Sequence, residues 1–127
     1  MQIQAIHHVS LIVNDTSRAL RFYCGVLGLP QVDRPDLGFP GAWLQVGEVQ
    51  QIHLLEVENP YAQVQLPEHG GRDRHTAFSI TELAALAERL SADGIAYRMS
   101  SSGRRALFCR DPDGNTLEFI ESRPEPQ

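Results

Sequence analysis

Cysteines, long apolar runs and a leader-like N-terminus are scarce or missing in this sequence, and each lack argues against a class of protein. The two cysteines, Cys24 and Cys109, do not form a Cys-based zinc motif, and we expect both to be small apolar side chains rather than a disulfide. The lack of a long apolar run excludes a membrane span. The first residues lack the basic and apolar regions of a secretory signal, so a cytoplasmic location is expected.

Basic residues are also too scattered to favour nucleic acid as a partner. The formal net charge is -5, and no run of lysine or arginine could neutralise a phosphate backbone. The chain has 127 residues, of which 42% are hydrophobic, which suits one compact domain with its own core. A small molecule is therefore the expected partner.

The most informative feature present is an internal repeat. The segment from Ile6 to Val13 returns at mid-chain as the segment from Arg74 to Ile80, and an amphipathic helical pattern follows each copy. A half-length unit cannot bury its own apolar face, whereas two packed copies can, leaving a cleft along their pseudo-symmetry axis. The sequence therefore predicts two duplicated modules.

Each module reads as strand, helix and three further strands. In module one, His8, Ser10 and Ile12 alternate onto one face of the first strand, and Gly28 ends the helix that follows. The strands expected in module one are 6–13, 31–34, 42–46 and 50–57. Module two repeats this order with strands 75–80, 95–99, 105–110 and 115–121, and with Leu83, Leu86, Ala87 and Leu90 as the apolar stripe of its helix.

These elements define the expected boundaries within a single domain, 1–127. Module one covers about 4–58, a linker covers about 59–73, and module two covers about 74–122. The linker carries prolines and glycines without a hydrophobic period, so it is either a lid over the cleft or a passive crossover. The tail 123–127 is expected to fray.

Four residues carry the expected chemistry. His8 and His75 open the first strand of each module, while His53 and Glu118 lie in the last strand of each. The distance in sequence from His8 to His75 differs by only two residues from the distance from His53 to Glu118. A pseudo-twofold would bring all four side chains toward one point. Imidazole nitrogen and carboxylate oxygen suit one divalent ion, Zn²⁺, Ni²⁺, Fe²⁺, Mn²⁺ or Co²⁺, and ligand types alone do not choose among them.

Other candidates have simpler interpretations. His7 alternates away from His8 and His69 sits in the linker, so we expect both rings to be solvated, and Ser10 to line the cleft. Glu56 is expected on the face opposite His53. The aromatic residues are most simply explained by packing: Phe22, Tyr23 and Trp43.

These residues resemble the vicinal oxygen chelate superfamily, which contains glyoxalases, bleomycin-resistance proteins and extradiol dioxygenases. The supporting stretches are Ile6 to Leu11, Phe22-Tyr23 leading to Leu27-Gly28-Leu29, His75 to Phe78, and Asp111 to Glu118. The resemblance implies an α+β fold of two βαβββ modules that form a curved mixed sheet around a metal ion. The ion opens two adjacent positions to a substrate with neighbouring oxygens, and the family's ligand positions fall on His8, His53, His75 and Glu118.

One position departs from the glyoxalase I pattern, which usually has glutamate where this chain has His53. An imidazole can bind a metal but cannot act as an anionic base, so a glyoxalase mechanism would rest on Glu118 or on water bound by the metal. The resemblance thus implies a metal-dependent lyase or isomerase of glyoxalase type, with Glu118 as its catalytic residue.

Alternatives within the superfamily remain open. A thiol transferase like the fosfomycin-resistance enzymes would use the metal to activate an epoxide, and an extradiol dioxygenase would bind Fe²⁺ through two histidines and one glutamate. A third alternative is a binding protein that sequesters a drug without catalysis, but such relatives generally lack the ligands that this chain retains. Relatives also cover apolar sheet surface by pairing two chains, so we expect a homodimer.

Overall fold

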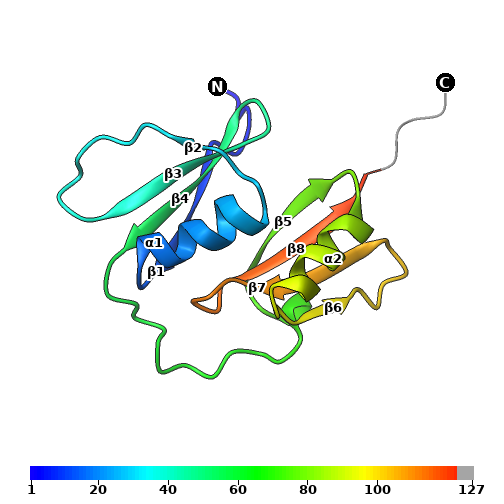
Figure 1. Ribbon diagram of the computed structural model, residues 1–127. Helices are drawn as coiled ribbons and strands as arrows, with labels where there is room; N and C mark the ends of the chain where they lie inside the picture. The colour runs from blue at the N-terminus through cyan, green and yellow to red at the C-terminus, as the bar shows by residue number, and fades with distance from the viewer. Residues whose placement is uncertain (123–127) are drawn as a thin grey trace. The chain divides into compact units, whose positions relative to one another are not determined.

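The computed structural model describes residues 1–122 and divides the chain into two compact units, Met1–Gln63 and Val64–Gln127 (Figure 1). Each unit contains one four-stranded mixed sheet and its own helices. This confirms the predicted α+β class built from two βαβββ modules. The tail 123–127, for which fraying is expected, lies outside the described residues.

The first unit follows the predicted order closely. Its elements are β1 (His8–Val13), α1 (Thr16–Leu20), the π-helix η1 (Arg21–Val26), β2 (Gln31–Val32), β3 (Gly41–Val46) and β4 (Gln50–Glu56). The sheet order is β1-β4-β3-β2, with β1 parallel to β4 and the other pairs antiparallel. Alternation along the strands places the buried Leu44, Ile52 and Leu54 on the face opposite His53.

The helix of the first unit differs from the expectation in its second half. Five residues of α helix lead into a π-helical turn, in which the amide of Leu27 donates to the carbonyl of Phe22 at 3.0 Å. Phe22 and Tyr23 are consecutive and both buried, which confirms that they serve packing. Gly28 has φ 76°, a conformation that favours glycine, and ends the helix as predicted.

The second unit repeats this plan. Its elements are the 3₁₀ turn η2 (Gly70–Arg72), β5 (His75–Ile80), α2 (Leu83–Ala92), β6 (Tyr97–Met99), β7 (Ala106–Arg110) and β8 (Thr116–Glu121), in sheet order β5-β8-β7-β6. Leu83, Leu86 and Leu90 of α2 are buried, as the predicted apolar stripe requires. Asp111 accepts hydrogen bonds from the amides of Asp113 and Asn115, both at 2.9 Å, which fixes the β7–β8 turn.

The repeat extends to the strand register. Ser10 of β1 lies opposite His53 of β4, and Ala77 of β5 lies opposite Glu118 of β8. Ser10 comes two positions after His8, and Ala77 comes two positions after His75, so the strand register is the same in both units. The same side-chain face is presented at equivalent places in the two sheets, as a duplication requires.

The two cysteines behave as small apolar side chains. Both are free thiols, and Cys109 is buried in β7 on the face that α2 covers. Burial, and secondarily the nearby Asp111 carboxylate, raise the pKa of the Cys109 thiol to about 12. The burial of Cys109 agrees with the expectation that it serves as a small apolar side chain.

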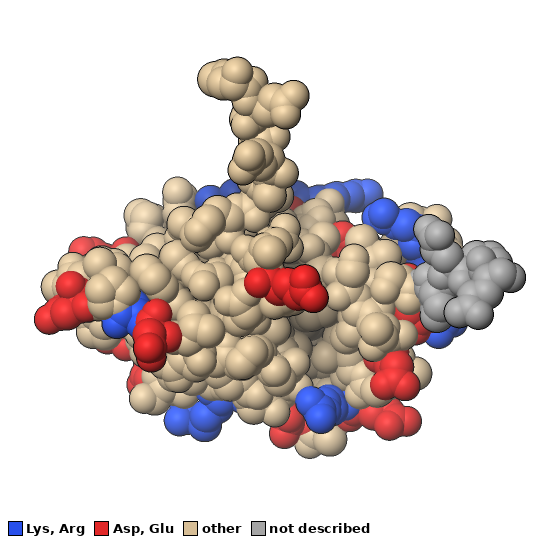
Figure 2. Space-filling model, turned by 90° about the horizontal axis from the view of Figure 1, so that it is seen from above, with Lys and Arg blue, Asp and Glu red and all other residues tan. Residues whose placement is uncertain are grey.

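Two further observations bear on partners. No helix in residues 1–122 is long and apolar enough to cross a membrane. On the face seen in Figure 2, acidic and basic side chains are interspersed, without a continuous basic patch over that face.

Candidate metal centre

The second unit brings two of the four expected ligands into contact. His75 opens β5 and Glu118 lies in the neighbouring parallel strand β8, so their side chains share one face of the sheet. His75 Nε2 lies 3.2 Å from Glu118 Oε1. Glu118 is 3% exposed, whereas the side chain of His75 is 27% exposed. A buried carboxylate and a partly exposed imidazole thus meet at the solvent-facing edge of this site.

The hydrogen bonds of His75 define which nitrogen faces the carboxylate. Its Nδ1 lies 2.8 Å from the carbonyl oxygen of Asp73, which can only accept, so Nδ1 carries the hydrogen. In the neutral ring, Nε2 then carries a lone pair, and this lone pair points toward a carboxylate oxygen. Two acceptors at this distance require a proton or a cation between them. A divalent ion fits this donor set.

The backbone carbonyl that orients His75 is itself fixed by a polar cluster. The carboxylate of Asp73 accepts from Arg110 at 2.8 Å and from Thr116 at 3.1 Å. Burial opposes ionisation of Asp73, but its hydrogen bonds with Arg110, the Arg74 amide and Thr116 outweigh burial and lower the pKa of this carboxyl. Arg110 also donates to the carbonyl of Pro67, so it ties the end of the linker to the second unit.

The first unit also brings its two candidates into contact, but in a different geometry. The rings of His8 and His53 are stacked, with centroids 3.9 Å apart and planes inclined by 16°. Trp43 stacks on the other side of His53 at 4.3 Å. An imidazole lone pair lies in the plane of its ring, so two stacked rings do not direct lone pairs at one ion. One ring must rotate about its side-chain torsions before both can coordinate the same metal.

The environment of His53 favours its neutral, metal-binding form. The residue is 8% exposed, and its Nε2 lies 2.8 Å from Gln51 Oε1. Burial lowers the pKa of His53, and the positive charges that His8, His7 and Arg34 can carry lower it further. A neutral imidazole is the form that binds a divalent ion.

The described residues do not bring the four candidates together. No group of three or more His, Cys, Asp or Glu side chains within residues 1–122 could hold a metal ion as arranged. The pair His8–His53 lies within the first unit and the pair His75–Glu118 within the second. The joint four-ligand site therefore stays a prediction.

The expectation for His69 was wrong, and that for His7 was right for an incomplete reason. His69 is half-buried, because the η2 turn folds the linker against β7: its Nδ1 accepts from the Gly71 amide at 2.9 Å and its ring contacts Phe108. His7 is exposed as predicted, yet its Nδ1 lies 2.9 Å from Nδ1 of His8. Since β1 begins only at His8, strand alternation does not apply to His7.

Sequence reasoning missed the aromatic neighbours of the candidates. Trp43 faces His53, and Phe108 stands edge-on to His75 with ring centroids 5.4 Å apart. Phe108 pairs with Glu118 across β7 and β8 as Trp43 pairs with His53 across β3 and β4. Extending the repeat to these strands would have found both aromatics.

Glu56, expected to face away from His53, does so and has a structural role. Its Oε1 accepts from the Thr16 amide at 2.7 Å and from the Thr16 hydroxyl at 3.1 Å, at the start of α1. Glu121 Oε2 accepts from the Leu83 amide at 3.0 Å, at the start of α2. The carboxylates at the ends of β4 and β8 therefore belong to the helix face, not to the site.

Comparison with known proteins places these features in a family. A sequence profile of the Glyoxalase/Bleomycin resistance protein/Dioxygenase superfamily matches residues 5–119. A protein named Glyoxylase I 4 from Arabidopsis thaliana is 30% identical over 125 residues, covering 94% of this chain and 71% of the relative. A lactoylglutathione lyase from Haemophilus influenzae is 28% identical, with 93% of each chain covered.

Other matches widen the range of activities and support the fold. Matching proteins include a catechol-2,3-dioxygenase from Bacillus subtilis and the glutathione transferase FosA from Serratia marcescens. A crystal structure of a glyoxalase family protein from Bacillus anthracis superposes with a TM-score of 0.77, covering 97% of this chain and 98% of its own. At 24% identity, that likeness shows the fold alone.

Proposed function

Because the chain belongs to the Glyoxalase/Bleomycin resistance protein/Dioxygenase superfamily, we propose that it is a divalent-metal-dependent enzyme of the glyoxalase type. Its substrate is a small molecule with adjacent oxygens, and the reaction is that of a lyase or isomerase. The observation that carries the proposal is the contact between Nε2 of His75 and the buried carboxylate of Glu118, with Nδ1 of His75 held by a backbone carbonyl.

The proposed ligands of the ion are His8, His53, His75 and Glu118, supplied by one chain or by two copies of it. Two of the ligand rings have a partner that orients them: the Asp73 carbonyl for His75 and Gln51 for His53. Such partners hold ligating rings and raise their basicity. When bound, a divalent ion would supply the Lewis acidity that polarises a substrate carbonyl.

The chain's own chemistry then rests on Glu118. In the glyoxalase reaction a proton leaves the carbon that bears sulfur and oxygen and returns to the neighbouring carbonyl carbon, which becomes an alcohol. Glu118 is the carboxylate in the candidate set, so it takes and returns this proton. Phe108, which is 8% exposed beside His75, shields this contact from water on one side.

Metal analysis of purified variants tests the site. We expect His75→Ala and Glu118→Ala to lose stoichiometric divalent metal, because each removes a ligand that has no substitute nearby, while His7→Ala retains it. Metal content by elemental analysis, with folding checked by circular dichroism, measures this. Full metal retention by Glu118→Ala would contradict the site assignment.

Turnover of a methylglyoxal–glutathione adduct tests the reaction, with metal content matched between proteins. We expect wild-type turnover, and a rise of up to about 10²-fold in His53→Glu, because a second carboxylate supplies a base suited to a carbon acid. A fall in His53→Glu would favour a thiol transferase or dioxygenase, whose Lewis acid is weakened by added negative charge. No turnover by either protein would eliminate the glyoxalase reaction and leave the metal site standing.

A further inference from the structure

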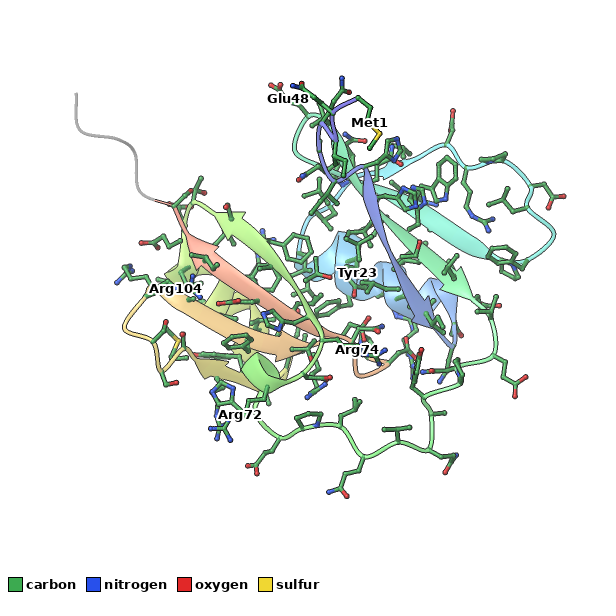
Figure 3. All side chains as sticks on the ribbon, turned by 180° about the vertical axis from the view of Figure 1, so that it is seen from behind. Met1, Tyr23, Glu48, Arg72, Arg74 and Arg104 are labelled. Atoms are coloured by element: carbon green, nitrogen blue, oxygen red, sulfur yellow. The ribbon has the colours of Figure 1, made fainter. Side chains whose placement is uncertain are left out.

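The carboxylate of Glu118 has a second neighbour besides His75. Its Oε2 lies 3.5 Å from Nη2 of Arg104, which precedes β7. The carboxylate is buried, whereas the arginine side chain is 60% exposed, so the guanidinium reaches the site face from the solvent side. Figure 3 shows Arg104 at the end of the second unit's sheet where β7 begins.

The contact between Arg104 and Glu118 is too weak to explain why the guanidinium is there. A single oxygen at 3.5 Å leaves most of the five N–H donors of Arg104 unused, and water screens a guanidinium whose side chain is 60% exposed. Arg104 can therefore exchange Glu118 for another oxyanion at little cost in free energy. If Glu118 instead ligates a divalent ion, its charge is shared with that ion and Arg104 is released.

Two other arginines of the second unit, unlike Arg104, form short ion pairs. Arg105 pairs with Glu121 at 2.6 Å on the helix side, and Arg110 pairs with Asp73 at 2.8 Å. Each of these two charges is already matched by a carboxylate. Their roles are therefore structural, and they add no net positive charge to the site face.

A second exposed arginine lies on the same row as Glu118. Arg98 of β6 pairs with Phe108, which in turn pairs with Glu118, so the three residues share one face of the sheet. Within residues 1–122 Arg98 forms no ion pair. The side chains of Arg98 and Arg104 thus both belong to the site face of the second unit, on which Glu118 lies.

We propose that Arg104, assisted by Arg98, binds a carboxylate group carried by the substrate next to its metal-chelating oxygens. This inference rests on the proposed metal-dependent function. A guanidinium presents parallel N–H donors that match the two oxygens of a carboxylate, a geometry that an ammonium group does not offer. The substrate class is therefore narrowed to an oxygen chelator that is also an anion at neutral pH.

Two hydroxamate chelators, one of which carries a carboxymethyl group that the other lacks, test this proposal. Acetohydroxamic acid offers neighbouring oxygens to a divalent ion, and N-hydroxysuccinamic acid offers the same hydroxamate with an added carboxymethyl group. Calorimetric titration uses protein loaded with the divalent ion found after purification, and metal content is measured after each titration. We expect the carboxylate probe to bind wild type about tenfold more tightly, as one charge-assisted hydrogen-bonded pair would provide.

The substitution Arg104→Gln should abolish the preference for the carboxylate probe without changing the affinity for acetohydroxamic acid. The matched control is Arg89→Gln, which alters an exposed arginine of α2 and should keep the preference. Equal affinity of the two probes for wild type, or a preference that survives Arg104→Gln, overturns the inference while hydroxamate binding supports the metal site. Failure of both probes to bind metal-loaded protein overturns the proposed function and the inference together.

Discussion

At the scale of single residues, the fluorescence of Trp43 can report changes at its neighbour His53. It is the single tryptophan of the chain, and its ring stacks on the imidazole at 4.3 Å with an angle of 7°. Coordination of an ion by His53 must either rotate the imidazole off the indole or bring the ion close to it. Both events change the emission of Trp43.

We therefore expect Ni²⁺ titration to quench Trp43 fluorescence and to saturate at one ion per site. His53→Gln should weaken the apparent affinity by at least about tenfold, since it removes a nitrogen ligand and leaves the indole in place. His7→Gln is the matched control and should titrate like wild type. An unchanged curve for His53→Gln would remove His53 from the ligand set.

The sequence was informative about residues whose position is set by strand alternation and uninformative about contacts made by loops. Register alone places His75 and Glu118 on one face, and the structure brings them to 3.2 Å. The contact between His69 and Phe108 depends on how the η2 turn folds back, and no pattern of apolar residues encodes that turn. The same holds for Arg104, which reaches Glu118 from a loop.

At the scale of elements, both helices begin against a carboxylate from the last strand of their unit. Glu56 accepts from the amide of Thr16 and Glu121 from the amide of Leu83. Free amides at a helix start carry a partial positive charge, so a carboxylate there is stabilising. α1 has a local cap as well, because Asp15 accepts from the Arg18 amide at 3.0 Å. In α2 the N-cap residue Glu82 makes no side-chain capping bond.

This difference predicts unequal costs for equivalent substitutions. Glu121→Ala should lower the free energy of unfolding by about 1–2 kcal/mol, because α2 then starts without a side-chain acceptor and Arg105 loses its partner. Glu56→Ala should cost less, about 0.5–1 kcal/mol, because Asp15 still caps α1. Urea denaturation at neutral pH measures both, and Glu88→Ala on the exposed face of α2 is the control. A larger loss for Glu56→Ala would contradict the assignment.

The elements themselves were largely predictable, with one physical exception. Alternating apolar residues and glycines that require positive φ, such as Gly28 and Gly94, mark strand positions and helix ends. The π-helical turn Arg21–Val26 was not foreseen, because Leu20, Tyr23 and Val26 fit α-helical spacing equally well. The π-helical turn contains the buried Phe22 and Tyr23, and local spacing does not distinguish it from a continuing α helix.

At the scale of the whole molecule, the duplication leaves each sheet with edges that its own unit does not cover. Strands β1 and β5 end their sheets, and each carries a proposed ligand, His8 or His75. Unpaired edge strands are usually covered by another element or another chain. Ile3 and Ile6, which precede β1, are 93% and 65% exposed. Exposed apolar side chains next to an edge strand are typical of a surface that pairs with another molecule.

We therefore expect a homodimer whose interface includes the chain segment before β1. Light scattering at micromolar concentration should give twice the mass of the chain. Ile6→Asp should shift the protein toward monomer, because a buried unpaired charge in an interface costs several kcal/mol. Val49→Asp, in the exposed β3–β4 turn, should remain dimeric. A wild-type monomer contradicts dimerisation, whereas a dimer that tolerates Ile6→Asp contradicts only the placement of the interface, because the substituted side chain would then remain in water.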